Sequence, residues 1–438
     1  MTEINGTNTS LTFKVTRQAP ELICPASPTP YESKELSDLD NSKDVRYLVP
    51  LIMFYRNPTS NINLYYLRGS DPVKVIKDAI AKALVWYYPL AGRLRETSEG
   101  KLVVECNEEG VVFIEADADV TLDDFGEPLH PPFPYSDELL YDVRDPLDIL
   151  HSPLLLIQVT RLKCGGFILA LRQNHTMTDG IGLVQFLNAV IELAGGAKRP
   201  SISPVWMRHL LINSPGPSQG SGQDVSYEFN RIAFPLGDLV HKCFFFGSTE
   251  MASLQQSIPP STTTFELIIA HLWRCHTMAL YNDPQEIVQL RFAMNTRSKY
   301  NPSLPAGYYG NVIAAPTAQA TIAELSENPF QYTVDLVKRT KENVNVNEEY
   351  LKSLANRMAE AVSRLTVSDH RRIGFNCLDF GWGRPVYGGF ARGSDFGRYL
   401  GYATCFAPFK HLGKSGALVP ICLPRSAMKK FVKLISLV

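Results

Sequence analysis

Hydrophobic and polar positions along the chain repeat with two different spacings, and each spacing predicts one kind of element. Apolar residues recur every three to four positions in some segments, which predicts amphipathic helices. These segments are residues 71–88, 181–194, 264–280 and 322–341. Alternating or continuous apolar runs predict strands at residues 11–20, 102–106, 111–118, 154–162, 167–173, 243–247 and 287–295. Helices and strands mixed in this way predict an α/β fold with mixed sheets.

Prolines and glycines mark where several of these elements begin and end. Pro72 lies at the start of the first helix, where a missing N–H is tolerated, and Pro89 ends it. A cysteine and two glycines separate strands 154–162 and 167–173, which are expected to form a hairpin. Another helix is expected before Leu365. The segments GFNCLDFGWG, YATCFAPF and GALVPICLP are expected to close the chain as strands and loops.

Residues 196–225 differ in composition from the segments on either side. They contain four prolines and the run SPGPSQGSGQ, which is typical of a linker. A chain of 438 residues is also too long for one ordinary hydrophobic core. We therefore predict an N-terminal domain at 1–195, a crossover linker at 196–225 and a C-terminal domain at 226–438.

Composition and charge exclude several classes of protein. A net charge of −1 argues against a protein whose main work is to bind nucleic acid. The first ten residues lack the basic and apolar regions of a secretory signal, and no apolar run is long enough to span a membrane. The eight cysteines form no CxxC pair, so neither a zinc site nor a thioredoxin motif is predicted, and no metal is expected because no ligand cluster with metal spacing appears. Reduced thiols in the cytosol are the expected state, and the predicted location is cytoplasmic.

The first candidate for chemistry is the segment His175-Thr-Met-Thr-Asp179-Gly180. His175 stands where a predicted strand ends, and imidazole can accept a proton near neutral pH. Asp179 could orient the imidazole or fix the turn, and Gly180 allows a tight backbone before the next helix. An ordinary strand-to-helix turn with a hydrogen-bonded histidine would show the same residues.

The second candidate is DFGWG, which begins at Asp379. Gly381 and Gly383 flank Trp382, so the backbone is expected to bend there and to hold the indole in one place. Taken alone, this motif favours a structural turn with a buried tryptophan over a functional site.

The two motifs in this order resemble the BAHD acyl-CoA-dependent acyltransferases of plants. The resemblance covers essentially the whole chain, because three further segments are similar to recurrent segments of that family. These segments are PTPYESKELSDLD (28–40), YYPLAGRL (87–94) and NTRSKYNPSLPAGYYGN (295–311). The likeness is greatest to the subgroup of benzyl alcohol O-benzoyltransferases and fruit alcohol acyltransferases, on the stretch PLLLIQVTRLKCGGFILALRQNHTMTDGIGLVQF.

This resemblance implies two chloramphenicol-acetyltransferase-like domains with the active site in a channel between them. It implies that His175 is the general base, and that Asp179 points away from the substrates and pairs with Arg297. Trp382 is expected to help position the reacting carbonyl. A largely structural role is implied for the rest of the second motif, namely Asp379, Gly381 and Gly383.

The implied reaction moves an acyl group from CoA to an alcohol and forms an ester. A benzoyl or a related aromatic or short acyl group is expected, with acyl-CoA as co-substrate, no permanently bound cofactor and a monomeric enzyme. A thioester is already activated, so a single base suffices without a covalent intermediate. Thr29 and Trp382 are candidate donors to the oxyanion. The helix start at Thr262, Thr263 and Thr264 is a candidate site for the CoA phosphates.

The sequence departs from the resemblance at two places. Gln173 stands where close relatives usually carry an apolar residue, and the stretch between Arg357 and Leu378 is shorter than theirs. Two alternatives remain open: the acceptor could be a bulky alkaloid alcohol of the tropane type, or the chain could be a catalytically silent relative that binds a ligand. A peptide condensation domain is disfavoured, because Asn174 occupies the position of its second histidine.

Overall fold

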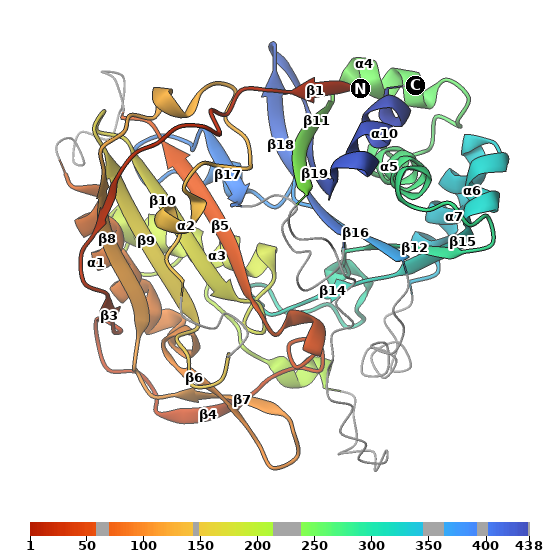
Figure 1. Cartoon of the computed structure of the whole chain (residues 1–438). Helices are drawn as coiled ribbons and strands as arrows, with labels where there is room; N and C mark the ends of the chain where they lie inside the picture. The colour runs from red at the N-terminus through yellow and green to blue at the C-terminus, as the bar shows by residue number, and fades with distance from the viewer. Residues whose placement is uncertain (58–69, 143–148, 213–237, 345–362, 392–401, 437–438) are drawn as a thin grey trace.

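The computed structural model describes residues 1–57, 70–142, 149–212, 238–344, 363–391 and 402–436. They form two halves that lie side by side, each built around a large mixed sheet (Figure 1). The prediction of an α/β fold with mixed sheets is therefore confirmed. No helix within these described ranges is long and apolar enough to cross a membrane.

The first sheet has the strand order β17-β5-β10-β9-β8-β2, and β3 also pairs with β8. Its neighbours are antiparallel except β8 and β9, which run parallel. The predicted hairpin is confirmed as β9 and β10. The strands are β2 (Val15–Arg17), β3 (Glu21–Ile23), β5 (Leu48–Tyr55), β8 (Val111–Ala118), β9 (Leu155–Leu162), β10 (Phe167–Asn174) and β17 (Tyr387–Phe390).

The second sheet has the strand order β1-β11-β19-β18-β16-β12-β15. Strand β16 lies between β12 and β18 and is parallel to both, whereas the other neighbours are antiparallel. The strands are β1 (Thr2–Ile4), β11 (Leu239–Phe246), β12 (Ile287–Phe292), β15 (Thr317–Thr321), β16 (Ser363–Asp369), β18 (Tyr402–His411) and β19 (Lys414–Pro424).

Smaller elements complete the fold. A three-stranded sheet contains β4 (Glu32–Glu35), β6 (Arg93–Glu96) and β7 (Leu102–Cys106), and β13 (Met294–Asn295) pairs with β14 (Ile313–Ala314). The α-helices are α1 (Pro72–Trp86), α2 (Ser136–Leu139), α3 (Gly180–Ala194), α4 (Ser248–Gln255), α5 (Thr264–Leu280), α6 (Ile322–Glu327), α7 (Phe330–Glu342) and α10 (Arg425–Ile435). Short 3₁₀ turns lie at Lys43–Val45, Tyr88–Ala91, Asp123–Phe125, Arg208–Leu211, Arg297–Lys299 and Phe375–Cys377.

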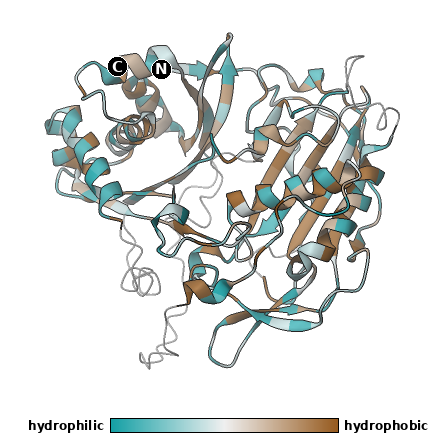
Figure 2. Cartoon of the chain, turned by 180° about the vertical axis from the view of Figure 1, so that it is seen from behind, coloured by the Kyte–Doolittle hydropathy of each residue, from teal (hydrophilic) through white to brown (hydrophobic). Residues whose placement is uncertain are grey.

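Strand β5 of the first sheet is apolar along its whole length because both of its faces are covered. In β5, Leu51 and Met53 pack under helices α1 and α3, whereas Ile52 and Phe54 pack on the opposite face against the segment around Phe125. Successive side chains of a strand point to opposite faces, so a continuous apolar run is what such a strand requires. Figure 2 shows this sheet as a hydrophobic layer between more polar coverings.

The two halves exchange strands. Strand β1, at the start of the chain, pairs with β11 in the second sheet, and β17, near its end, pairs with β5 in the first (Figure 1). The division at 1–195, 196–225 and 226–438 remains a prediction, and these pairings add that neither sheet is made from one continuous stretch of sequence.

The helices follow the sequence pattern closely where their ends carry a cap. Asp71 accepts a hydrogen bond from the backbone N–H of Val73 at the start of α1, with Pro72 as the first helical residue. Thr263 caps α5 in the same manner through the N–H of Glu266. The predicted helices at 71–88, 181–194 and 264–280 are therefore confirmed to within two residues at either end.

Other predicted elements differ from the structure. The strand expected at 11–20 is reduced to β2, and Pro329 breaks the helix expected at 322–341 into α6 and α7 because it cannot continue a helical hydrogen-bond ladder. Strands 102–106 and 111–118 exist but lie in different sheets. Helix α10 was not predicted. The residues before 363, where another helix was expected, lie outside the described ranges.

Candidate active site

The backbone of His175 is fixed from two directions at the end of β10. Its N–H donates to the carbonyl oxygen of Tyr47 at 3.0 Å, and its own carbonyl oxygen accepts from the side-chain amide of Asn311 at 2.7 Å. The Tyr47 ring meets the imidazole edge-on at 5.4 Å. The side chain of Asn174 accepts from both the N–H and the hydroxyl of Thr176, which closes the turn after His175.

Asp179 organises the other end of this loop. One carboxylate oxygen accepts from the N–H of Gly182, so Asp179 caps α3, and the other accepts from the N–H of Val312 at 3.1 Å. Arg297 donates to both oxygens, at 2.8 and 3.0 Å. The structure thus contains the Asp179–Arg297 pair implied by the resemblance. Both oxygens are occupied by these donors, so Asp179 acts on the position of the loop.

A buried network supports the same loop from behind. Asp40 accepts from the backbone and side-chain N–H groups of Asn311, at 2.9 and 2.8 Å. The guanidinium of Arg208 lies 3.3 Å from Asp40 and donates to the carbonyl oxygen of Met177 at 2.7 Å. Asp40 and Arg208 are both buried. This network joins three distant segments to residues 175–179, which we call the HTMTD loop, and limits the movement of that loop.

Gln173, the first departure from the resemblance, also serves this loop. Its side-chain amide is buried and donates to the carbonyl oxygens of Asn174 and Thr178, the latter at 2.9 Å. An apolar side chain could not make these bonds. The shortened stretch between Arg357 and Leu378 lies partly outside the described residues, but β16, which lies within it, pairs with both β12 and β18.

His175 opens into a cavity of about 250 Å³ between the two halves of the molecule. One wall comes from β5, β10 and the start of α3, and the other from β12, β16, β18 and the residues that follow β16. Apolar side chains dominate the lining, including Val49, Leu51, Ile181, Ile313 and Ala403. A mostly apolar cavity with a few convergent polar groups is typical of a small-molecule site.

Burial sets the protonation state of His175. Loss of solvent lowers the pKa of its imidazole, and this effect outweighs the opposing influence of the Asp179 charge. The ring is therefore neutral at neutral pH and can accept a proton. Its Nδ1 atom is buried, and hydrogen bonding with its own backbone and with the side chain of Asn311 favours the protonated ring once a proton has been accepted.

The DFGWG segment is a turn held by its own aspartate. Asp379 accepts from the N–H groups of Gly381 and Gly383, at 2.8 and 2.9 Å. Both glycines have φ near +90° to +100°, a region that other residues rarely adopt. The Trp382 ring packs against Phe167 at 5.4 Å.

The structure does not bring Trp382 to His175, which corrects the expected role of this tryptophan in positioning the carbonyl. Phe167 begins β10 and His175 follows the end of that strand, so about 26 Å of extended chain separates them. Trp382 is also absent from the lining of the cavity. Its observed role is in packing.

The remaining predicted contacts lie elsewhere. Thr29, the other candidate oxyanion donor, donates through its backbone N–H and its hydroxyl to Glu108. The hydroxyl of Thr263 is occupied as the cap of α5, and neither it nor Thr262 and Thr264 line the cavity. Within the described ranges, no group of three or more acidic, histidine or cysteine side chains is arranged to hold a metal ion.

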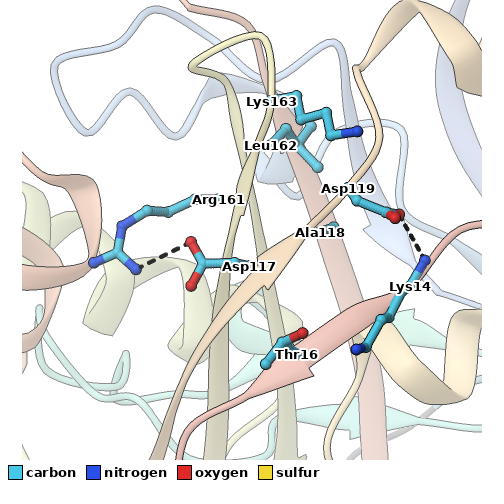
Figure 3. Close-up of a pocket in the computed structure, with 8 residues that line it drawn as sticks. All are labelled: Lys14, Thr16, Asp117, Ala118, Asp119, Arg161, Leu162 and Lys163. Atoms are coloured by element: carbon cyan, nitrogen blue, oxygen red, sulfur yellow. Dashed lines mark hydrogen bonds and ion pairs between the residues drawn. The ribbon is translucent and has the colours of Figure 1, made fainter.

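A second pocket lies on the surface of the first half and offers no comparable chemistry. Figure 3 shows that the guanidinium of Arg161 points to Asp117 and that the backbone N–H of Lys14 points to Asp119. Arg161 also pairs with Asp71. Arg161, Asp117 and Asp119 of this pocket are thus already engaged in ion pairs or hydrogen bonds.

Several residues of the site were not singled out from the sequence. Asp40 and Asn311 lie in two of the segments that resemble the family. Arg208 lies in the predicted linker, where no motif or hydrophobic pattern marks it as a residue of the site. Ser368 and His370 also line the cavity. The alternation of polar and apolar residues in LTVSDH was the signal that could have placed them on one face of a strand.

Sequence and fold are both similar to those of known enzymes. A family model described as "Transferase family" matches residues 13–437. The chain is 50% identical over 441 residues to benzyl alcohol O-benzoyltransferase of Petunia hybrida, covering 97% of this chain and 94% of the relative. It is 45% identical over 445 residues to (Z)-3-hexen-1-ol acetyltransferase of Arabidopsis thaliana, covering 98% and 95%. The crystal structure of vinorine synthase matches the fold with a TM-score of 0.73 at 24% identity, covering 97% and 98%.

Proposed function

The chain belongs to the transferase family of BAHD acyl-CoA-dependent acyltransferases, and from this we propose that it transfers a benzoyl or short acyl group from CoA to a small primary alcohol. The general activity is acyl-CoA-dependent O-acylation of an alcohol, which forms an ester. The observation that carries the finer proposal is the neutral His175 in a small apolar cavity between the two halves.

The residues present account for the chemistry of such a transfer. His175 accepts the hydroxyl proton as the alcohol oxygen attacks the thioester carbonyl, because an alcohol is a poor nucleophile until that proton leaves. The carbonyl electrons move onto oxygen and form a tetrahedral oxyanion. Its collapse breaks the carbon–sulfur bond, and the CoA thiolate takes the proton from His175. One base serves both steps, so we propose direct transfer without an acyl-enzyme.

The size and polarity of the cavity support a small acceptor. Its volume of about 250 Å³ lies below the roughly 300–1,000 Å³ of sites that enclose drug-sized ligands. A phenyl ring or a short alkyl chain suits its apolar lining, whereas a bulky alkaloid alcohol would have to displace one wall. The names of the two relatives, a benzoyltransferase and an acetyltransferase, agree with small acyl groups and small alcohols.

The experiment that tests this proposal is a thiol-release assay with purified protein. Benzoyl-CoA and acetyl-CoA are each combined with benzyl alcohol, (Z)-3-hexen-1-ol and tropine, and the ester is identified by gas chromatography. We expect free CoA and ester with the two small alcohols and much less with tropine. Preference for tropine would replace the small-alcohol proposal. Binding of acyl-CoA without turnover of any acceptor would identify a silent relative.

We further propose that the protein works as a monomer in the cytosol. None of the eight cysteines, all of which lie in the described ranges, forms a disulfide bond, which agrees with a reducing compartment. The cavity is lined by both halves of a single chain, so the site needs no second copy. Light scattering of the purified protein and imaging of a fluorescent fusion test these two statements separately.

A further inference from the structure

The cavity has a second polar wall, formed by β16. Residues 366–370 all line the cavity, and Leu365 and Val367 also belong to the core of the second half. Side chains alternate between the two faces of an extended chain, so those of Thr366, Ser368 and His370 share the face opposite to that core. Since β16 and β10 belong to different sheets, a substrate in the cavity meets the base on one side and this wall on the other.

Ser368 and His370 form a hydrogen-bonded pair on this wall. The Ser368 hydroxyl oxygen lies 2.7 Å from Nε2 of His370. The imidazole is held between two aromatic rings, because Phe375 stacks on it at 6.0 Å and Phe390 meets it edge-on at 4.6 Å. Its backbone N–H donates to the carbonyl oxygen of Phe406 at 3.0 Å. The ring therefore has little freedom, and its Nε2 fixes the place of the serine hydroxyl.

The surroundings of His370 decide which way this hydrogen bond runs. Burial lowers the pKa of His370 to about 4 against the opposing charge of Asp369, so the ring is neutral at pH 7 and carries one N–H. Nδ1 is buried and has no hydrogen-bond partner among the described residues. Buried N–H groups without an acceptor are rare in proteins, which places the proton on Nε2. Nε2–H then donates to Ser368, and the serine hydroxyl hydrogen is free to point into the cavity.

We propose that Ser368 donates a hydrogen bond to the thioester carbonyl oxygen of the acyl-CoA, and that His370 is the positioning residue that aims it. This rests on the acyl transfer proposed above. As the alcohol oxygen bonds to the carbonyl carbon, the carbonyl electron pair moves to oxygen, and the Ser368 O–H strengthens its hydrogen bond to that oxyanion. The bond to Ser368 weakens again when the carbon–sulfur bond breaks and thiolate leaves.

This assignment also excludes Ser368 as a nucleophile. A serine attacks a thioester only when a base removes its proton. Nε2 of His370 already carries a hydrogen in the arrangement above, and a ring that protonates only near pH 4 is a weak base at pH 7. The pair therefore supplies a donor for the oxyanion, a role that neither Thr29 nor Trp382 can fill from its observed place.

The test compares two variants of nearly equal shape, Ser368→Thr and Ser368→Val, which differ by one hydroxyl. We expect Ser368→Thr to keep most of the wild-type kcat and Ser368→Val to lose on the order of 10²-fold, as when one donor of an oxyanion hole is removed. The KM values should stay within about threefold of wild type, because the lost interaction strengthens only in the transition state. His370→Phe keeps the ring packing but not the donor, and its kcat should fall by about tenfold. Ser253→Ala on α4, outside the cavity, is the matched control that should leave activity unchanged.

Two results would overturn the proposal. One is a kcat for folded Ser368→Val above about a third of wild type. The other is an acyl adduct on Ser368 in wild-type protein incubated with acyl-CoA alone, because that would make the serine a nucleophile. Failure of the transfer itself is distinguishable, since wild type would then turn over no acyl-CoA with any alcohol. If Ser368→Val does not fold, Ser368→Ala takes its place in the same comparison.

Discussion

Replacing Arg297 by alanine should loosen the loop that carries His175. Asp179 is 1% exposed, and Arg297 supplies two of the four donors to its carboxylate. Removing one partner of a buried ion pair costs about 3–5 kcal/mol, because the remaining charge loses its compensation. The Arg297 side chain is 20% exposed, so water replaces part of the interaction. We therefore expect a loss of about 2–3 kcal/mol for Arg297→Ala.

The assay is a double-mutant cycle measured by thermal unfolding and by steady-state kinetics. For a folding unit of about 200 residues, 1 kcal/mol shifts Tm by about 2–4 °C, so Arg297→Ala should lower Tm by roughly 4–12 °C. Asp179→Asn should also destabilise, and the two changes together should show a coupling of about 0.5–3 kcal/mol. In kinetics, kcat should fall more than KM rises, since the loop positions the base.

Strict additivity of the two substitutions would refute this reasoning, because it would mean that the two side chains do not share an interaction. A Tm for Arg297→Ala within the error of wild type would do the same. Arg425→Ala is a matched control, since that arginine pairs with Asp238 on the surface, where both side chains are more than half exposed. Exposed pairs contribute about 0–1 kcal/mol, so its Tm should hardly change.

Four further outcomes can be measured. His175→Ala should lower kcat/KM by about 10²–10⁴-fold while circular dichroism stays unchanged; a loss under tenfold would remove the base role. Gly310→Ala should cost more than about 3 kcal/mol in urea unfolding, because its Cβ would lie 1.0 Å from a guanidinium nitrogen of buried Arg208. Burial lowers the pKa of His271 to about 4 and of His276 to about 3, so the unfolded chain takes up protons that the folded one does not. The contribution of these two histidines to stability should therefore be nearly complete at pH 7.5 and fall by about 2–3 kcal/mol by pH 5.5; a flat profile there would contradict this burial. Initial rates against acyl-CoA at several alcohol concentrations should give intersecting lines, whereas parallel lines with an acylated protein would indicate ping-pong transfer.

The helices and hairpin were predictable because their signals are local. The apolar stripe between Pro72 and Pro89 and the cap at Thr263 lie within the elements they define. Pairing between distant strands has no such signal. Strands 102–106 and 111–118 are separated by only four residues, yet they lie in different sheets. The pattern of one strand fixes which face is buried but not which strand lies beside it.

The candidate site shows the same limit. His175 and Asp179 were predictable because they share one short motif. Trp382 was predicted near the reacting carbonyl, but its turn packs at the far end of β10. Ser368 and His370 reach the cavity only because β16 places them there. A role that depends on three-dimensional proximity between distant segments leaves little trace in any one of those segments.

The strand exchange has a consequence for synthesis of the protein on the ribosome. Strand β5 is an apolar strand whose outer edge is covered by β17, and β17 is made more than 330 residues later. During translation the first sheet therefore has an open, hydrophobic edge until residue 390 has left the exit tunnel. Such an edge is a template for pairing with another chain. Chaperone binding to nascent chains should consequently persist until late in synthesis, and a fragment that ends at residue 212 should aggregate even though it contains the complete HTMTD loop.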